Sequence, residues 1–118
     1  MKRLAALLLL CVLLTGCGPA VPEPAPGRLQ IVAAVFPAYD FARAAVGDLA
    51  DVSLLLPPGA ESHSYEPTPA DILRVQNCDL FIYLGGESDA WVDTILSAVE
   101  PKGQALRLTD CVELLEEE

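Results

Sequence analysis

Short apolar runs alternate with segments of helical periodicity from residue 29 onward, and this alternation limits the possible folds most strongly. Residues 29–35 (LQIVAAV) and 80–84 (LFIYL) are almost continuously apolar, which is typical of strands covered on both faces. Residues 52–56 and 105–108 are predicted as two further strands. Strands that alternate with helices form open parallel sheets with right-handed crossovers. We therefore predict an α/β domain at residues 29–118, with an open parallel sheet and helices on both faces.

The segments between the expected strands carry helix signals. Thr68 is a good N-cap residue, Pro69 follows it at the first helical position, and Asp71 completes a capping-box-like pattern. Residues 39–46 predict another helix, with Phe41, Ala44 and Ala45 at helical spacing on one face.

Two acidic residues are placed near expected helix starts. Asp89 can cap a helix that continues to residue 99, and Trp91 lies on the apolar face of this helix. Asp40, which follows Pro37, is interpreted as a helix cap rather than a ligand. We expect Trp91 to pack in the core or on the face of the domain, with a contact to a second lobe as the alternative.

The first residues predict a lipoprotein signal peptide. Lys2 and Arg3 precede an apolar run at residues 4–14, which as a helix would rise about 16 Å. Because a bilayer core is about 30 Å thick, this run is too short for a stop-transfer helix. The sequence LTGC resembles a bacterial lipobox, so we expect residues 1–16 to be removed and Cys17 to be lipidated. The alternative is an ordinary secretory signal with an incidental cysteine.

Residues 17–28 are predicted to follow the anchor as a proline-rich tether. Four prolines at 19, 22, 24 and 26 favour an extended tether between the anchor and the domain.

The chain has 7 basic and 17 acidic side chains, a net charge of −10. Nucleic acid is bound by clustered Lys and Arg, so we expect no nucleic-acid partner. An acidic surface suits cations, or it has no particular partner.

The two cysteines of the domain are predicted to be buried free thiols. Cys78 precedes the third expected strand and Cys111 follows the fourth, so parallel strands place them at opposite ends of the sheet. Four strand residues already span about 13 Å, whereas a disulfide joins Cα atoms within about 7 Å.

The loop at residues 57–67 carries the only histidine of the sequence, His63. It follows the second expected strand, and ligands of open parallel sheets bind beyond the carboxyl ends of the strands. A neutral imidazole is a common ligand for a borderline cation, and the flanking prolines restrict the loop. Taken alone, however, a single histidine in a loop is more often a solvated side chain than a metal ligand.

Three stretches resemble a known family: IVAAVFPAYDFARAAVGD, LLLPPGAESHSYEPTPADI and DLFIY. They are similar to the amino-terminal lobe of metal-binding ABC-transporter solute-binding proteins, the zinc and manganese receptors of solute-binding protein family 9, adhesin-lipoprotein type. The resemblance implies a two-lobed receptor like the periplasmic binding proteins, with the ion between the lobes. It makes His63 the first metal ligand and places the others, further His and an Asp or Glu, later in the chain. We therefore expect residues 29–118 to be the amino-terminal lobe of a longer receptor whose carboxyl-terminal lobe is absent from this sequence.

The neighbours of His63 are expected to support it rather than bind metal. Glu66, next to Tyr65, is interpreted as orienting the loop or facing the helix amino terminus, and Glu61 is the other nearby carboxylate. We expect Tyr65 to pack the loop onto the lobe. Ser62 and Ser64 are expected to be solvated or to support the turn.

The predicted function is capture of a divalent cation outside the cytoplasm for an ABC permease and its ATPase. Zinc is expected because imidazole is the identified ligand, and manganese is the alternative if oxygen ligands dominate elsewhere. The resemblance also leaves open a surface adhesin or structural lipoprotein. No catalytic motif is recognised and a second histidine is lacking, so we expect no enzyme. We expect a monomer held at the outer face of the bacterial membrane through Cys17.

Overall fold

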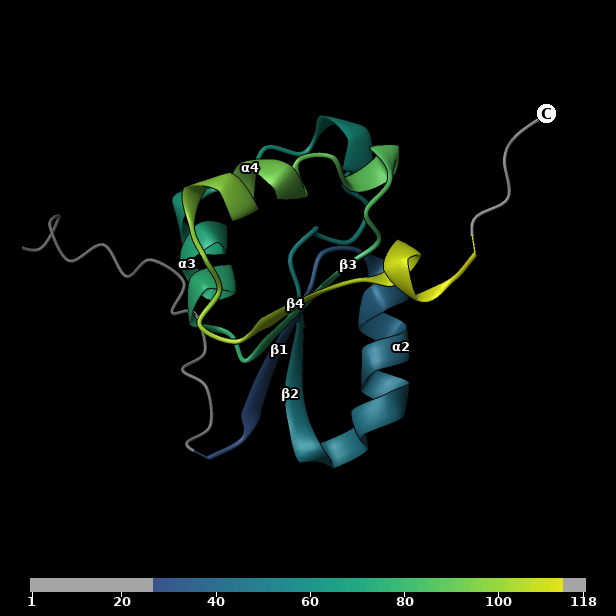
Figure 1. Cartoon of the computed structure of the whole chain (residues 1–118), viewed down its shortest axis with the longest axis vertical. Helices are drawn as coiled ribbons and strands as arrows, with labels where there is room; N and C mark the ends of the chain where they lie inside the picture. The colour runs from purple at the N-terminus through teal and green to yellow at the C-terminus, as the bar shows by residue number, and fades with distance from the viewer. Residues whose placement is uncertain (1–26, 114–118) are drawn as a thin grey trace, which may run out of the picture.

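The computed structural model describes residues 27–113, which form a four-stranded parallel sheet. Figure 1 shows the strands at the centre of the molecule. Their bounds are β1 at Leu29–Ala33, β2 at Ala50–Leu54, β3 at Leu80–Tyr83 and β4 at Gln104–Arg107. The strand order is β2-β1-β3-β4, and every neighbouring pair is parallel. The predicted signal peptide, lipidated Cys17 and tether up to residue 26 lie outside the described residues.

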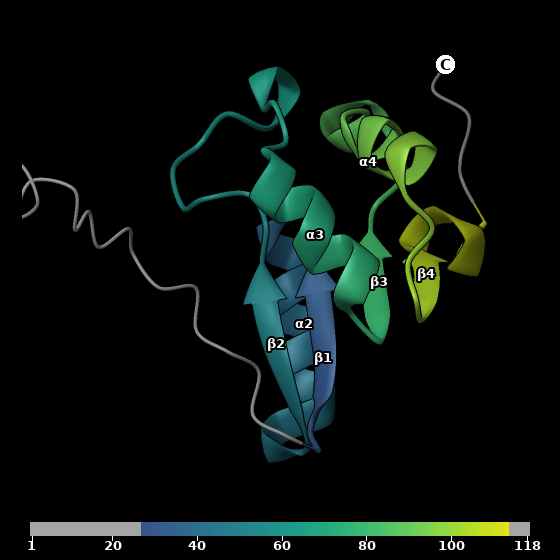
Figure 2. The same cartoon turned by 90° about the vertical axis from the view of Figure 1, so that its left-hand side faces the viewer.

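Helices cover both faces of the sheet, as the sequence predicts. The helices are α2 at Phe36–Val46, α3 at Pro69–Asn77 and α4 at Val92–Ala98. Figures 1 and 2 show α2 on one side of the strands and α3 with α4 on the other. The chain adds β2 on one side of β1 and β3 on the other, so the right-handed connections place their helices on opposite faces. Among the described residues, no helix combines the length and the apolarity that crossing a membrane requires.

The core includes buried side chains from the sheet and from all three helices, and its largest fully buried apolar side chains are Phe81, Ile95, Val75 and Val92. Val75 comes from the helix that starts with the predicted capping box. Thr68 accepts a hydrogen bond from the backbone N–H of Asp71, and Asp71 accepts one from the backbone N–H of Thr68. The cap therefore fixes where α3 begins.

The prediction for α2 was wrong in three respects. The helix starts at Phe36, because Pro37 lies in its first turn, where a missing N–H costs no hydrogen bond. Asp40 is consequently an exposed residue inside the helix and not its cap. The face turned to the sheet consists of Ala38 and Ala42, whereas Phe41 is 72% exposed.

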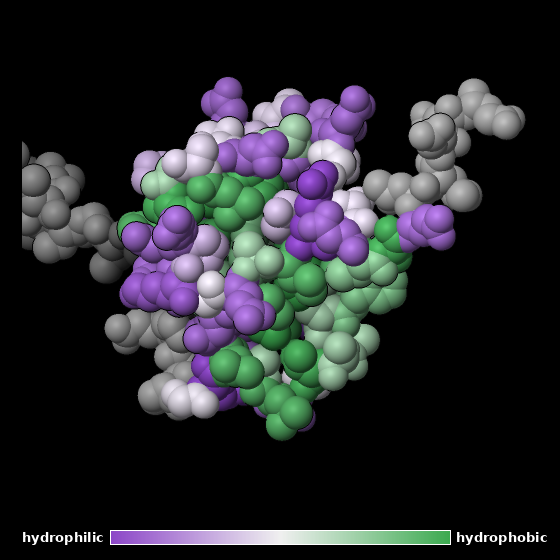
Figure 3. All heavy atoms as spheres, viewed as in Figure 1, coloured by the Kyte–Doolittle hydropathy of each residue, from purple (hydrophilic) through white to green (hydrophobic). Residues whose placement is uncertain are grey.

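The outer surface of α2 is correspondingly apolar. Phe36, Phe41 and Leu49, just after the helix, are all more than half exposed. Figure 3 shows hydrophobic surface where Figure 1 places α2, and mainly hydrophilic surface at the top of the same view.

Both cysteines of the domain are free thiols, as predicted. Cys78 is buried, and its burial, with the nearby Asp79 carboxylate, raises the pKa of the thiol to about 11. The expectation of a buried Cys111 was wrong, because the turn at Leu108–Cys111 leaves this side chain exposed.

Candidate functional site

Two turns that follow β2 and β3, the strands on either side of β1, meet at the carboxyl edge of the sheet. The loop after β2 contains a 3-10 turn at Ser62–Ser64, and the loop after β3 contains another at Glu87–Asp89. The two turns are in contact and lie at the top of Figure 1. Parallel strands end at one edge of a sheet, so this meeting follows from the topology.

His63 occupies the middle of the Ser62–Ser64 turn, and its side chain is exposed. Glu61 and Glu66, the nearest carboxylates in the chain, are exposed as well. Among residues 27–113, no group of three or more His, Cys, Asp or Glu side chains is arranged to hold a metal ion. The described part of the chain therefore offers His63 as an accessible imidazole but does not by itself surround an ion.

The loop leaves β2 in a fixed direction. The backbone N–H groups of Leu55 and Leu56 donate to Ala33 and Ala34, at 2.9 and 3.1 Å, so pairing with the neighbouring strand continues beyond β2. Gly59 then has φ = 80°, a left-handed conformation that favours glycine. These contacts limit the paths that the chain can take towards His63.

A buried carboxylate holds the other end of the loop. Asp71, which is 7% exposed, accepts hydrogen bonds on Oδ2 from the Tyr65 hydroxyl at 2.8 Å and from the Thr68 hydroxyl at 2.6 Å. The Arg74 guanidinium lies 3.6 Å from Oδ1 and also donates to the Leu54 carbonyl. The carboxylate therefore connects the loop, α3 and the end of β2.

These contacts shift two pKa values in opposite directions. Burial opposes ionisation of Asp71, but the hydrogen bonds from Thr68 and Tyr65 and the charge of Arg74 outweigh it and lower the pKa of this carboxyl. Burial and the bond to the Asp71 carboxylate raise the pKa of Tyr65 to about 12. Tyr65 therefore remains a neutral hydrogen-bond donor at physiological pH.

Tyr65 also joins the two loops. Its ring meets the ring of Trp91 edge to face, with centroids 4.8 Å apart and an interplanar angle of 72°. Trp91 follows the Glu87–Asp89 turn and is buried. On the other side of His63, the Ser62 hydroxyl donates to the Ser88 carbonyl. The His63 turn therefore contacts the second loop through its neighbours on both sides.

The second loop is built around Asp89, whose role the sequence analysis missed. Asp89 was expected to cap the following helix, but α4 begins only at Val92 and the carboxylate turns back into its own loop. It is 2% exposed and accepts hydrogen bonds from the backbone N–H groups of Leu84, Gly85 and Gly86, at 2.7, 3.0 and 3.1 Å. Two glycines followed by an acidic residue three positions after the second were the available signal.

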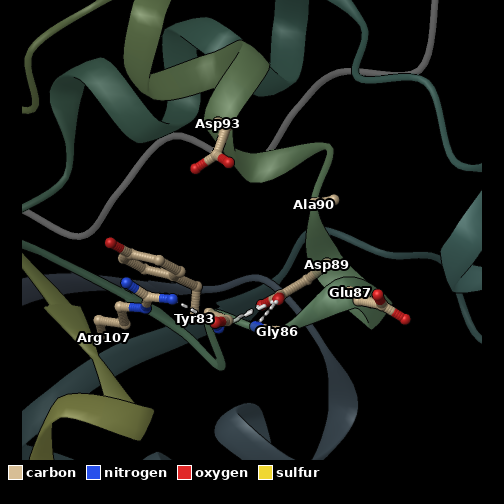
Figure 4. Close-up of a pocket in the computed structure, with 8 residues that line it drawn as sticks. Tyr83, Gly86, Glu87, Asp89, Ala90, Asp93 and Arg107 are labelled. Atoms are coloured by element: carbon tan, nitrogen blue, oxygen red, sulfur yellow. Dashed lines mark hydrogen bonds between the residues drawn. The ribbon is translucent and has the colours of Figure 1, made fainter.

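A cavity of about 400 Å³ lies beside this loop. Figure 4 shows Tyr83 and Arg107 on one side and Asp93 opposite them, with Gly86, Asp89 and Ala90 along the loop. Arg107 donates to the Gly85 carbonyl and lies 4.0 Å from Asp110. The cavity wall thus combines acidic side chains with a guanidinium that already has partners.

Comparisons with known proteins agree on one family. The family model described as ZnuA, zinc-uptake complex component A periplasmic, matches residues 31–118. The zinc-binding lipoprotein AdcA of Streptococcus pneumoniae is 36% identical over 104 residues, which are 86% of this chain and 20% of that protein. The high-affinity zinc uptake system protein ZnuA of Bacillus subtilis is 40% identical over 77 residues, 65% of this chain and 23% of that protein.

Solved structures match in the same way. The Zn(II)-bound ZnuA-like domain of S. pneumoniae AdcA superposes with a TM-score of 0.68 at 33% identity, covering 75% of this chain and 34% of that chain. The metal-dependent lipoprotein YcdH of B. subtilis gives a TM-score of 0.69 at 32% identity, with the same coverage of this chain. The chain spans about a fifth of the length of the curated relatives and about a third of these solved chains. The sequence match and the parallel sheet lead to one conclusion: the chain belongs to the ZnuA family of periplasmic zinc-uptake components.

Proposed function

We propose that residues 29–118 are the amino-terminal lobe of an extracytoplasmic receptor that captures Zn²⁺ and delivers it to an ABC permease. The observation that carries this proposal is the position of His63. The only histidine of the sequence stands on an exposed turn at the carboxyl edge of a parallel sheet, in a chain whose relatives are named for zinc binding and zinc uptake.

His63 supplies one donor to the transported ion. Zinc is commonly bound by four ligands in a tetrahedron, and imidazole nitrogen is among its preferred donors. The described residues contain no group of three potential ligands. The remaining donors would therefore come from outside the described residues, which agrees with the match to only about a third of the solved relatives. The ion would then be held between two lobes.

The choice of ion follows from the donor atoms. A site rich in imidazole favours Zn²⁺, whereas added carboxylate and carbonyl oxygens would favour Mn²⁺. Glu61 and Glu66 are exposed beside His63, and we assign them a role in orienting the loop rather than in binding the ion. No catalytic step is assigned to the chain.

The proposed location is the outer face of the cell membrane, with a lipid anchor at Cys17 and the domain acting as a monomer. The LTGC sequence before the proline-rich segment supports the anchor, and AdcA of S. pneumoniae is itself named a lipoprotein. The partners would be the permease and the ATPase of the importer.

The test is a zinc titration of the receptor as produced from its gene, by competition with a chromogenic chelator. We expect His63→Ala to weaken zinc binding by about a hundredfold or more, because a missing ligand cannot be replaced from a solvent-exposed turn. The control is Asp40→Ala, an exposed carboxylate in the middle of α2 and outside this loop, which should bind zinc as the parent protein does.

Three other outcomes would change the proposal. Unchanged zinc binding in His63→Ala would contradict the site. A loss in Glu66→Gln as large as that in His63→Ala would make Glu66 a ligand. A deletion strain that grows normally without added zinc but loses attachment to surfaces would favour the adhesin function instead.

A further inference from the structure

The His63 turn is bound to the second loop through the side chain of Ser62. The Ser62 hydroxyl donates to the carbonyl oxygen of Ser88, which lies 26 residues further along the chain. Ser62 is partly buried by this contact, whereas Ser64, at the other end of the same turn, is exposed. The two serines that flank His63 therefore have different environments, although the sequence alone does not separate them.

The acceptor of this hydrogen bond stands on a rigid piece of backbone. Asp89, the residue after Ser88, binds the three backbone N–H groups that precede the turn, and its carboxylate is almost completely buried (Figure 4). Gly85 has φ = 87° and lies under the Arg107 side chain, which donates to its carbonyl. The Ser88 carbonyl is thus a fixed acceptor for the Ser62 hydroxyl of the first loop.

A second contact fixes the chain on the other side of His63. The backbone N–H of Tyr65 donates to the Ser62 carbonyl at 3.3 Å and closes the turn. The Tyr65 side chain is held by Asp71 and by the Trp91 ring. With Tyr65 held in this way, the hydroxyl of Ser62 is the side-chain contact that sets the position of the other end of the turn.

We propose that Ser62 is a positioning residue for the metal ligand, and that its bond to Ser88 holds the His63 imidazole in the orientation that the ion requires. This inference rests on the proposed function of His63. A ligand held in place before binding loses less conformational entropy when the ion arrives, so the affinity for the ion rises without any new contact to it. Ser62 itself does not touch the ion.

The experiment compares the two serines of the turn in the receptor as produced from its gene. Zinc affinity is measured by chelator competition for Ser62→Ala, Ser64→Ala, Ser62→Thr and His63→Ala, with a thermal melt of each metal-free variant. We expect Ser62→Ala to weaken zinc binding about three- to tenfold, the effect of one lost hydrogen bond. Ser64→Ala should bind as the parent does, and Ser62→Thr, which keeps a hydroxyl, should restore most of the affinity.

Melting temperatures separate positioning from stability. Substitutions at such surface sites change stability little, so the metal-free melting temperatures should stay within about 3 °C of the parent. A drop of more than that in Ser62→Ala, in proportion to its loss of affinity, would make the contact merely structural and overturn the inference. An equal loss of affinity in Ser64→Ala would overturn it too.

The His63→Ala result distinguishes this inference from the proposed function. If His63→Ala loses zinc while Ser62→Ala binds normally, the receptor function stands and the positioning role is wrong. If His63→Ala binds zinc normally, the proposed site is wrong and the positioning role fails with it.

Discussion

Two buried aspartates organise the two loops at the carboxyl edge of the sheet, and they do so with different partners. Asp71 binds mainly side chains, the hydroxyls of Tyr65 and Thr68 and the guanidinium of Arg74, with one backbone donor, the N–H of Thr68. The carboxylate of Asp89 binds backbone N–H groups, those of Leu84, Gly85 and Gly86. When a carboxylate is removed, side chains that were bound to it can rotate and find other hydrogen-bond partners. Backbone N–H groups in a tight turn cannot rotate in this way, so they lose their acceptor.

From this difference we expect the substitution of Asp89 to cause the largest loss of stability. Replacing it by Ala leaves three partly buried backbone donors without their acceptor, so we expect Asp89→Ala to lower the free energy of unfolding by about 3 kcal/mol. Urea denaturation followed by circular dichroism measures this. The control is Asp93→Ala, an exposed carboxylate on α4, which should change stability by less than about 0.5 kcal/mol. Similar losses in the two variants would show that the bonds of Asp89 contribute little.

A smaller and pH-dependent effect is expected at Asp71. The pKa of this carboxyl is lower in the folded protein than its ordinary value of about 3.9. Its ionised form therefore stabilises the fold above about pH 4, and this contribution is lost as the pH falls through the lowered pKa. Asp71→Asn should cost about 2 kcal/mol at pH 7 and less at pH 3.

The free energy of unfolding, measured between pH 3 and pH 7, tests the direction of this pH dependence. Asp40→Asn is the control, because Asp40 is exposed in the middle of α2 and should leave the pH dependence unchanged. If Asp71→Asn keeps the acid sensitivity of the parent protein, another carboxylate is responsible for it.

The smallest effect is expected for the hydroxyl of Tyr65. Tyr65→Phe keeps the ring against Trp91 but removes the donor to Asp71, so we expect a loss of about 1 kcal/mol. Tyr39→Phe on α2 is the matched control, with a change near zero. The raised pKa, to about 12, means that the stabilisation is present below about pH 10 and is lost as the pH rises towards 12. An ultraviolet titration in which no tyrosine ionises near pH 12 would contradict this assignment.

The two carboxylates also differ in how well the sequence predicts them. Asp71 and Thr68 are three residues apart and form a local capping pattern, so the start of α3 could be predicted correctly. Asp89 stands before a helix pattern in the same way, but its neighbours Gly85 and Gly86 present free N–H groups to it. The choice between the following helix and the preceding turn depends on the path of the backbone, which local sequence rules do not give.

Helix α2 gives the same lesson for packing. Its helical character follows from the sequence. The sequence does not decide, however, whether Phe41 or the alanines form the face that packs on the sheet. The sheet accepts Ala38 and Ala42 because small side chains let the helix approach β1 and β2 closely. Phe41 is left on the surface.

By itself the sequence determined the alternation of strands and helices, the capping of α3 and the place of His63 after the second strand, because each depends on residues that are neighbours along the chain. The tertiary structure alone decided that Ser62 meets Ser88, that Tyr65 meets Trp91 and that Asp89 holds the turn beside them. The first two contacts join segments that follow different strands, and they form only because parallel pairing brings the ends of β2 and β3 to the same edge of the sheet.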